Sequence, residues 1–289
     1  GTDRLVMLSI HDLLGGHCEF DIVLDRGNAI KFAGRYLNNL LEKTDIRIAS
    51  ITGGVQNNVI PAEAEVILAV DEKQLGLVKE IVEQTTKEIK NEYRLTDPNI
   101  VVELLDCTEE KEYVFGKKTG TILTKSILLL PNGVMSMSHK NAGISECSCN
   151  IGLMQTVTNT VKIISTITSE VTTRKHEVMK QIIALAELVG NGVKGFQFGT
   201  DAPEWDYNEN SEMLKKAVAA YEAVVGEKPG IEVMPASLEL GLFKSRIEGL
   251  DIISVGTETH GVHTPKEELR IDSVAKVWGV FKELLKTLK

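Results

Sequence analysis

Apolar residues recur three and four positions apart, with charged residues between them, in five stretches of the sequence. This spacing places the apolar side chains on one face of an α-helix, so each stretch is predicted to be helical. The predicted helices cover residues 27–43, 72–93, 173–190, 210–226 and 271–287.

Short runs rich in β-branched and other apolar residues lie between these helices, and several are bounded by Gly, Pro or Asn. Such runs are typical of strands, so the sequence predicts a mixed α and β protein. The predicted strands cover residues 3–10, 46–53, 63–70, 99–106, 147–154, 160–167, 193–198, 230–234 and 251–255.

The run Gly190-Asn191-Gly192 predicts a domain boundary. After it, strands and helices alternate with short connections, as in one half of a layered α/β domain. Before it, strand pairs and helices alternate less regularly. We therefore expect residues 1–190 to form an α+β domain with antiparallel strands. Residues 191–289 are expected to form part of a three-layer α/β domain whose other strands are absent.

Length and charge narrow the class of protein. The chain has 289 residues, 43% of them hydrophobic, which is enough for a substantial core. Its net charge of −9 repels nucleic acid and anionic membranes, so neither is an expected partner. No apolar run approaches the roughly 20 residues that a membrane span needs, and no signal peptide is evident. Because there is no initiator Met and residues 5–10 already read as a strand, we expect the sequence to begin inside a longer protein, at an engineered or processed end.

The four cysteines lack the spacing of a zinc ribbon. Cys147 and Cys149 lie in an alternating stretch, which places both side chains on one face of a strand. We therefore expect small, reduced core residues in a cytosolic protein and no disulfide framework.

Two histidines occupy positions suited to chemistry. His263, within Gly261–Pro265, follows the predicted strand over residues 250–255 and lies beyond its C-terminal end, the usual ligand side of an α/β sheet. It is a candidate metal ligand pinned between two rigid elements. His17 follows the paired glycines Gly15 and Gly16, which allow a sharp turn that presents an imidazole. A solvated loop residue and a turn-capping residue are the respective alternatives.

Three polar residues at two places in the sequence complete the candidate set. Asn57 and Asn58 precede the run 59–61, and a side-chain amide can donate to a carbonyl or an oxyanion. Glu239 stands in a nearly apolar run at a junction between a strand and a helix. Turn formation by the asparagines and capping of a helix N-terminus by the glutamate are the alternatives. The other histidines read as surface or structural residues: His11, His139, His176 and His260.

The order and spacing of these candidate residues resemble those in the cytosolic dipeptidases, which belong to the co-catalytic di-zinc aminopeptidase and carboxypeptidase family. The resemblance extends over nearly the whole sequence. It depends on several motifs that occur in the same order as in the family, and no single motif would be sufficient. The motifs are Gly15-Gly16-His17, Gly27-Asn28-Ala29, Gly53-Gly54, Asn58-Val59-Ile60-Pro61, Pro131-Asn132-Gly133-Val134, Trp205 with Asn210-Ser211, Leu238-Glu239-Leu240-Gly241-Leu242-Phe243 and Gly261-Val262-His263-Thr264-Pro265-Lys266-Glu267.

The resemblance implies a fold of α/β and α+β type. An inserted lid domain, residues 1–190, would be followed by the C-terminal part of a three-layer α/β zinc-peptidase domain, residues 191–289. It also implies a dipeptidase with two zinc ions. The family's first catalytic segment, with its His-x-Asp motif, bridging Asp, Glu-Glu pair and further Asp ligand, has no counterpart in this sequence. Only His263 matches a metal ligand, and one imidazole cannot hold a di-zinc pair.

The resemblance also implies roles for the other site residues. His17 matches a substrate-contacting histidine that helps to stabilise the tetrahedral intermediate, and Asn58 matches a neighbouring polar contact. Glu239 matches a carboxylate in the substrate cleft. Thr168 stands where the family has an arginine that pairs with the substrate carboxylate, and a hydroxyl cannot replace a bidentate guanidinium. Arg174, six residues further on, is one possible substitute.

A second departure follows His17, because residues 18–20 are Cys-Glu-Phe where the family commonly has Ser-Gly-Gly. These bulkier side chains are expected to alter the approach of a substrate. Two functions therefore remain open. The whole protein is a dipeptidase of which this chain alone is inactive, or the chain is a non-catalytic remnant that binds a partner. Family lids commonly carry the homodimer contact, so a second copy is the expected partner.

Overall fold

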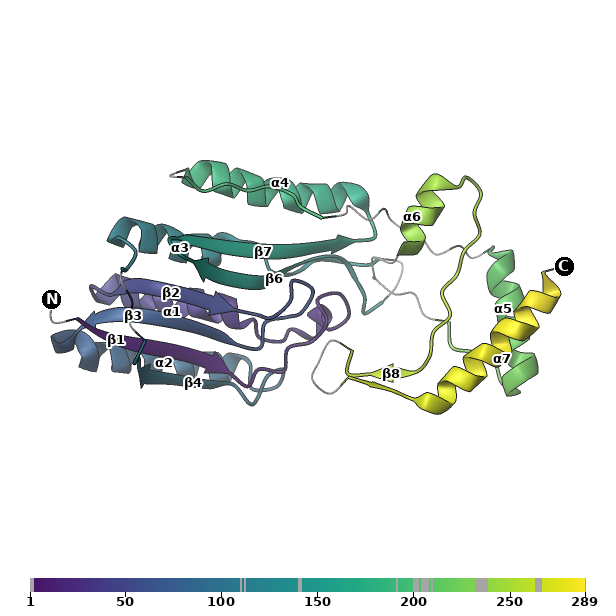
Figure 1. Cartoon of the computed structure of the whole chain (residues 1–289), viewed down its shortest axis with the longest axis horizontal. Helices are drawn as coiled ribbons and strands as arrows, with labels where there is room; N and C mark the ends of the chain where they lie inside the picture. The colour runs from purple at the N-terminus through teal and green to yellow at the C-terminus, as the bar shows by residue number, and fades with distance from the viewer. Residues whose placement is uncertain are drawn as a thin grey trace.

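The computed structural model contains two groups of elements, a large sheet with its helices and a smaller helical group at the other end of the molecule (Figure 1). The first group ends with α4 and the second begins with α5. The described residues are 3–109, 111, 113–139, 142–190, 192–199, 203, 208, 210–231, 239–262 and 267–288.

The large sheet has seven strands in the order β4-β1-β3-β2-β6-β5, and β7 pairs with β6 outside this path. Every pairing within it is antiparallel, as the sequence predicts for the first domain. The strands are β1 (Asp3–His11), β2 (Arg47–Gly53), β3 (Ala64–Asp71), β4 (Val101–Asp106), β5 (Gly133–Met137), β6 (Ser145–Val157) and β7 (Thr160–Ser169).

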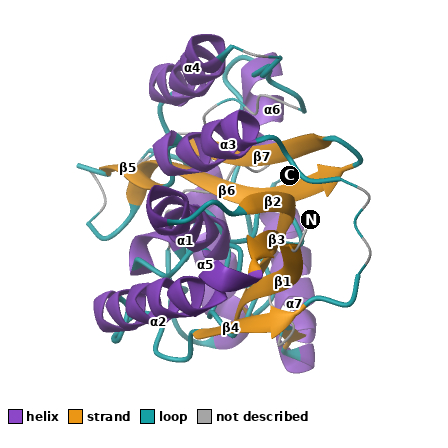
Figure 2. Ribbon diagram, turned by 90° about the vertical axis from the view of Figure 1, so that its left-hand side faces the viewer, coloured by secondary structure: helices purple, strands orange, loops and turns teal. Residues whose placement is uncertain are grey.

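Four α-helices pack against one face of this sheet (Figure 2). Two short 3₁₀-helices accompany them, one before α1 and one at the start of α2. The elements are η1 (Ile22–Leu24), α1 (Ala29–Lys43), η2 (Glu72–Gln74), α2 (Leu75–Glu92), α3 (Lys117–Leu129) and α4 (Thr172–Val189).

The main core lies between the sheet and these helices. Alternation along β1 directs Val6, Leu8 and Ile10 toward the helices, where each is at most 2% exposed. The helical period of α1 brings Tyr36 and Leu37 to the same interface, with both side chains fully buried. The apolar side chains of the strand and of the helix therefore pack in one layer, which holds the sheet that supports the candidate site.

A small cluster beneath α4 contains Cys147 and Cys149 on one face of β6, as predicted. Burial raises the pKa of the Cys149 thiol to about 12, so this group stays neutral and weakly nucleophilic at ordinary pH. All four cysteines are free thiols, and Cys18 is buried as well. The expectation of small core cysteines is wrong only for Cys107, which is partly exposed.

The second group has its own small core, formed by Ala217 and Ala220 of α5 with Val280 and Leu284 of α7. Many of the large apolar side chains described in this group are exposed, Trp278 and Leu285 among them. The elements are α5 (Glu212–Val225), α6 (Glu239–Arg246), β8 (Thr259–His260), β9 (Glu268–Leu269) and α7 (Ile271–Thr287).

All five predicted helices are present, as are the six predicted strands before residue 170. No strand forms at 193–198 or 251–255, so these two predictions are wrong. A strand needs a hydrogen-bonded neighbour, and neither segment has one among the described residues. Residues 232–234 of the remaining predicted strand lie outside the described part. None of the described helices is long and apolar enough to cross a membrane.

Candidate functional site

The turn that carries His17 depends on its two glycines. Gly15 and Gly16 have φ angles of +62° and +126°, which residues with side chains rarely adopt. A Cβ on Gly16 would also overlap the side chains of Asp21 and Arg26. The Asp21 carboxylate accepts a hydrogen bond of 2.7 Å from the backbone N–H of His17. The Arg26 guanidinium donates to the carbonyl oxygen of Gly15 at 2.7 Å.

His17 and Asn58 lie next to each other although 41 positions separate them in the sequence. An isolated antiparallel bridge pairs His17 with Val59. Beside it, the N–H of Cys18 donates to the carbonyl oxygen of Asn58 at 3.0 Å. The backbone therefore brings together two of the residues that the sequence singles out.

The hydrogen bonding of His17 sets its tautomer. The backbone N–H of Glu19 donates to Nδ1 of His17 at 3.0 Å, so Nδ1 is the unprotonated nitrogen and the neutral ring carries its proton on Nε2. The ring of Phe20 lies 4.5 Å from the imidazole, measured between centroids. His17 is 8% exposed. An N–H donor held in place in this way suits the stabilisation of a developing negative charge.

The loop that contains Asn58 is held on one face of β6 and β7. Asn150 donates from its side-chain amide to the carbonyl oxygen of Val59 at 2.8 Å. The hydroxyl of Thr166 donates to the carbonyl oxygen of Asn57 at 2.8 Å. Both bonds reach backbone atoms, so they fix the path of the loop rather than the rotamer of Asn58.

A glycine bulge lets this loop approach the sheet. The register between β6 and β7 shifts at Gly152, which makes it an extra residue on β6. A Cβ on Gly152 would overlap the backbone of Asn57, and one on Gly54 would overlap the carbonyl of Gly152. Only glycine at these two positions permits so close an approach of the two backbones.

Asn150 also belongs to a group of three asparagines, in which Asn28 and Asn150 are buried and Asn132 is half-buried. Asn28 donates from its amide to Oδ1 of Asn132 and to the carbonyl oxygen of Ile151, both at 3.0 Å. Oδ1 of Asn132 accepts in addition from the N–H of Ile151 at 2.9 Å. Asn28 simultaneously caps the N-terminus of α1. This network couples the main helix of the domain to the strand that holds the site loop.

Thr168 lies in the polar strand patch, which we define as Ser148, Asn150, Thr166 and Thr168. Pairing of Ser148 with Thr168 and of Asn150 with Thr166 places the four side chains on one face. The hydroxyl groups of Thr168 and Ser148 are hydrogen-bonded at 2.8 Å, and Thr168 is 6% exposed. Thr166, which holds the loop, is two residues or about 7 Å away along β7.

Arg174, the possible substitute for the expected arginine, already binds a carboxylate of the protein. Its guanidinium Nε lies 2.7 Å from Oε1 of Glu146, so the cation already has a carboxylate partner. Glu146 is largely shielded from solvent, with 15% of its side chain exposed, while the Arg174 side chain is 48% exposed. The structure therefore favours a mainly structural role for Arg174.

Two candidate residues are not placed. His263 lies outside the described residues, and Glu239 begins α6 but its side chain is not described. The described part of the chain contains no group of three His, Cys, Asp or Glu side chains that could hold a metal ion. The described residues therefore do not make up a zinc site by themselves.

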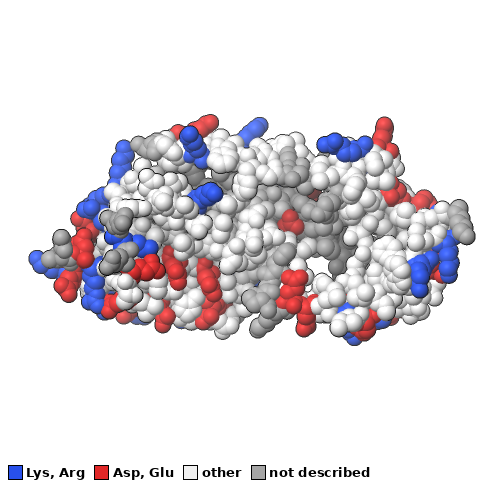
Figure 3. Space-filling view, in the orientation of Figure 1, with Lys and Arg blue, Asp and Glu red and all other residues white. Residues whose placement is uncertain are grey.

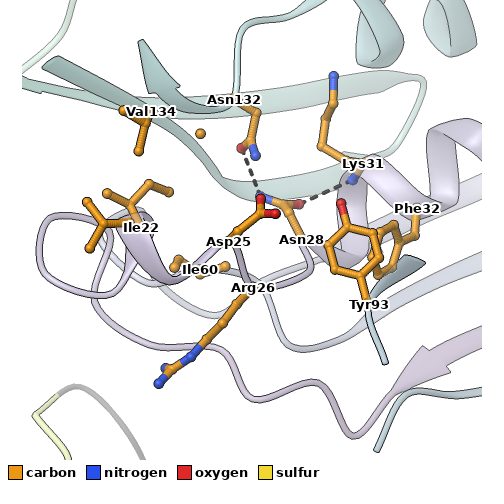
Figure 4. Close-up of a pocket in the computed structure, with 12 residues that line it drawn as sticks. Ile22, Asp25, Arg26, Asn28, Lys31, Phe32, Ile60, Tyr93, Asn132 and Val134 are labelled. Carbon is orange, nitrogen blue, oxygen red and sulfur yellow. Dashed lines mark hydrogen bonds between the residues drawn. The ribbon is translucent and has the colours of Figure 1, made fainter. Parts of the chain in front are cut away.

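A cavity of about 480 Å³ lies between η1, the start of α1 and β5 (Figure 4). Two cations line it, and both already bind protein groups. Arg26 bonds to the turn before His17, and Nζ of Lys31 donates to three carbonyl oxygens at the end of α3, at 2.8 to 3.0 Å. Burial lowers the pKa of Lys31. We assign no ligand to this cavity.

The sequence did not reveal Asn150, Gly152 or the role of Asn28. One signal was present, since an asparagine within the predicted buried strand 147–154 requires a hydrogen-bond partner. Asn28 and Asn132 lie within motifs of the resemblance, but without an assigned role. The bulge at Gly152 could not be placed without the register of two strands.

Three comparisons with known proteins show what this chain is similar to. The peptidase dimerisation domain family matches residues 10–97. The cytosol non-specific dipeptidase of Escherichia coli strain K12 is 30% identical over 283 residues, which is 97% of this chain and 57% of that protein. The crystal structure of aminoacylhistidine dipeptidase from Vibrio alginolyticus superposes with a TM-score of 0.80 and 30% identity, over 99% of this chain and 58% of that one. The chain therefore spans a little over half the length of these relatives.

Proposed function

We propose, on the premise that this chain is homologous to cytosol non-specific dipeptidase and aminoacylhistidine dipeptidase, that it forms two segments of a dipeptidase. Residues 1–190 would be the lid and dimerisation domain, and residues 191–289 the C-terminal half of the catalytic α/β domain. The separate cores of the two groups of elements support this division.

One observation carries the proposal. The turn at His17 is fixed by the bridge to Val59, and the bond from Glu19 leaves the proton of the neutral ring on Nε2. A positioned N–H donor can bind the oxygen of a scissile carbonyl and gains strength as that oxygen becomes negative. This is the role of His17 in the proposed reaction, and the match to a solved dipeptidase over nearly the whole chain supplies the context.

The other candidate residues would orient the substrate. Asn58 is partly exposed beside His17, where its amide can contact a peptide group. Thr168 would contribute a hydroxyl near the substrate carboxylate in place of an arginine. Glu239 would face the cleft from the start of α6, where a carboxylate suits the ammonium group of a dipeptide.

We further propose that the longer protein requires zinc and that His263 is one ligand. The remaining ligands would come from polypeptide that this sequence does not include, because the family's other ligand motifs have no counterpart in it. This chain alone is then expected to be inactive. When bound, the metal would supply an activated water and polarise the scissile carbonyl.

The proposed compartment and partner follow from the same relatives. The Escherichia coli relative is named as a cytosolic enzyme, and four free thiols fit a reducing compartment. The match of residues 10–97 to a peptidase dimerisation domain supports a homodimer formed through the first domain. The alternative is that the chain is a non-catalytic remnant that dimerises or binds a partner. The match to the dimerisation domain supports this alternative as well.

The decisive experiment measures zinc content and hydrolysis of alanyl-histidine by the chain alone and by the chain co-expressed with the unaligned part of the Vibrio alginolyticus dipeptidase. We expect activity only in the second case. Within that complex, His17→Gln should lower kcat by about a hundredfold, as for the loss of one oxyanion donor. The exposed His139→Gln is the matched control and should have little effect.

Two results would overturn the proposal. Hydrolysis by the chain alone that survives removal of contaminating peptidases would contradict the need for a second segment. Equal activity of the two histidine variants would remove His17 from the reaction. Absence of activity in a complex that forms and binds zinc would favour the non-catalytic alternative.

A further inference from the structure

One carboxylate binds both ends of the loop that presents His17. Oδ1 of Asp97 accepts a hydrogen bond from the backbone N–H of Leu14 at 2.9 Å, and Oδ2 accepts from the N–H of Gly27 at 3.0 Å. These two donors are 13 positions apart in the sequence, with the turn at His17 between them. We call residues 14–27 the His17 loop. Its two ends therefore meet at a single side chain.

Asp97 differs from most acidic residues of the chain because it is buried. Figure 3 shows Asp and Glu side chains on the surface of the molecule, whereas Asp97 is 1% exposed. Burial raises the pKa of its carboxyl group, and the bonds from Leu14 and Gly27 and the charge of Arg26 oppose that rise. A buried carboxylate is costly unless such donors satisfy it. The chain therefore keeps a costly group at the point where the two ends of the loop meet.

Asp97 is anchored to the main core through α2. Its backbone N–H donates at 2.8 Å to the carbonyl oxygen of Tyr93, the residue that follows the last turn of this helix. The ring of Tyr93 contacts that of Phe32 in α1 edge-on, with the centroids 4.9 Å apart. Gly27 packs against the same ring, since a Cβ on it would lie 2.7 Å from a ring carbon of Phe32. The carboxylate thus connects the loop to two helices of the domain rather than to another loop.

Two charged side chains stabilise the internal shape of the His17 loop. Asp21 accepts from the N–H of His17. Arg26 donates to the turn before that residue, and its guanidinium lies 3.4 Å from the Asp21 carboxylate. These contacts keep the turn folded, but they do not fix where the loop lies on the domain. The bridge to Val59 holds its middle, and Asp97 holds its ends.

We propose that Asp97 is a positioning residue of the proposed dipeptidase reaction. It places the Nε2–H donor of His17 by fixing both ends of the loop on the core, and it makes no contact with the substrate. An asparagine could not replace it, because an amide has one acceptor oxygen and an NH₂ group that cannot accept from the second N–H. The proposal rests on the proposed role of His17, but part of its test needs no catalysis.

The first test is NMR spectroscopy of the whole chain alone with Asp97→Asn. We expect the imidazole signals of His17 and the N–H signal of Glu19, which donates to Nδ1 of that ring, to shift or to split as the loop takes up more than one position. Asp25→Asn is the matched control, and both sets of signals should stay in place. Asp25 is an exposed residue of the same loop with a φ angle of +52°, a conformation that asparagine also adopts.

The second test uses the complex with the unaligned part of the Vibrio alginolyticus dipeptidase. Asp97→Asn should lower kcat for alanyl-histidine by about tenfold and change KM less than twofold, since the displaced donor acts mainly in the transition state. In a His17→Gln background the same change should lower kcat no further, because a residue that acts through His17 loses its effect once that imidazole is gone. Asp25→Asn should change neither constant by more than twofold.

Native-state hydrogen exchange of the unchanged chain covers the case in which Asp97→Asn does not fold. The N–H groups of Leu14, Gly27 and Glu19 should open together, with the same dependence on denaturant, because one carboxylate ties both ends of the loop. Opening of Glu19 while both ends stay protected would show that the carboxylate does not control the turn.

Three results would overturn the proposal. They are this independent opening of Glu19, unaltered His17 signals in a folded Asp97→Asn chain, and an equal loss of kcat with and without His17. An inactive complex would count against the dipeptidase function alone, because the NMR and exchange measurements on the chain decide the role of Asp97 by themselves.

Discussion

Asn150 donates a hydrogen bond of 2.8 Å from its side-chain amide to the carbonyl oxygen of Val59, the residue that pairs with His17 in an isolated bridge. A buried strand thus holds the loop on which the position of the candidate catalytic histidine depends. Asn150 is 1% exposed, so the interaction is shielded from water. This part of the site is therefore held by the sheet, although His17 and Asn58 themselves lie in loops.

Replacing Asn150 by alanine should loosen this loop. The carbonyl of Val59 would lose its partner in a buried setting, which typically costs about 1–3 kcal/mol. We expect a lower free energy of unfolding and faster hydrogen exchange at the N–H of Cys18, which bonds within the same bridge. Asn91→Ala, on the exposed surface of α2, is the control and should leave exchange at Cys18 unchanged. An unaltered exchange rate in Asn150→Ala would show that the loop does not depend on this bond.

Replacing Gly152 by alanine should displace the same loop by steric overlap. Its Cβ would meet backbone atoms of Asn57, which cannot move aside as the end of a flexible side chain can. We expect a loss of about 1–3 kcal/mol in the free energy of unfolding, as for overpacked sites. Gly76→Ala in α2 is the matched control, because a Cβ there meets no atom within 4 Å. That change should stabilise the helix by about 0.5–1 kcal/mol. Similar effects of both substitutions on stability would contradict this account.

The sequence predicts an element well when the residues that determine it are close together in the chain. Periodicity alone locates α1, since its apolar residues and the capping Asn28 are all local. Helix α3 is missed because Gly120 and several Ser and Thr residues interrupt the apolar repeat. The segment 251–255 reads as a strand for a sound reason, its apolar composition. It forms none here because strand formation also requires a neighbour.

The candidate site shows the same limit. Paired glycines before His17 predict the turn, and their positive φ angles agree with that reading. Nothing local predicts that His17 meets Asn58, because the contact requires a bridge between distant loops. The bulge at Gly152 and the bond from Asn150 depend on the register of β6 against β7, which the sequence does not specify by itself.

The hairpin between β6 and β7 contains a removable strain. Thr158, the first residue of its two-residue turn, has a φ angle of +50°, an unfavourable conformation for a β-branched residue. Thr158→Gly should therefore raise the free energy of unfolding by about 1 kcal/mol. Asn159→Gly, at the neighbouring position without a positive φ, is the control and should lower stability by about 0.4–1 kcal/mol through unfolded-state entropy. Thermal unfolding of both variants measures the difference, and a destabilised Thr158→Gly would contradict it.

Asp251 makes hydrogen bonds to the start of α5 that depend on the charge of its carboxylate, and therefore on pH. Its carboxylate accepts from the N–H of Met213 at 2.8 Å and from the hydroxyl of Ser211 at 2.6 Å, at the start of α5. These two bonds lower the pKa of Asp251. Because the folded-state pKa lies below the unfolded value near 3.8, the stabilisation is present above that pH and is lost as the pH falls through the folded pKa.

Asp251→Asn should therefore destabilise the α5–α7 group at pH 7 by about 1 kcal/mol or less, comparable to the loss of a helix cap. The difference from the unchanged chain should shrink toward zero below about pH 4. Denaturation followed by circular dichroism at each pH measures it, and Glu227→Gln controls for the loss of one exposed negative charge. A difference that stays constant between pH 3 and 7 would show that the carboxylate charge plays no part.

Thr168 tests the proposed recognition of the substrate carboxylate. Its hydroxyl is bonded to Ser148, so in the chain alone Thr168→Arg should be destabilising, because a guanidinium would enter a site that is 6% exposed. In the proposed complex with the unaligned part of the Vibrio alginolyticus dipeptidase, a bound dipeptide would offer that guanidinium a carboxylate partner. Charge-assisted hydrogen bonds contribute about 1.5–3 kcal/mol, so kcat/KM for a free dipeptide should rise by about tenfold or more. The C-terminally amidated dipeptide is the control, since it has no carboxylate to bind. An equal effect on both substrates, or none on either, would place residue 168 away from the substrate carboxylate and leave the Ser148–Thr168 pair with a purely structural role.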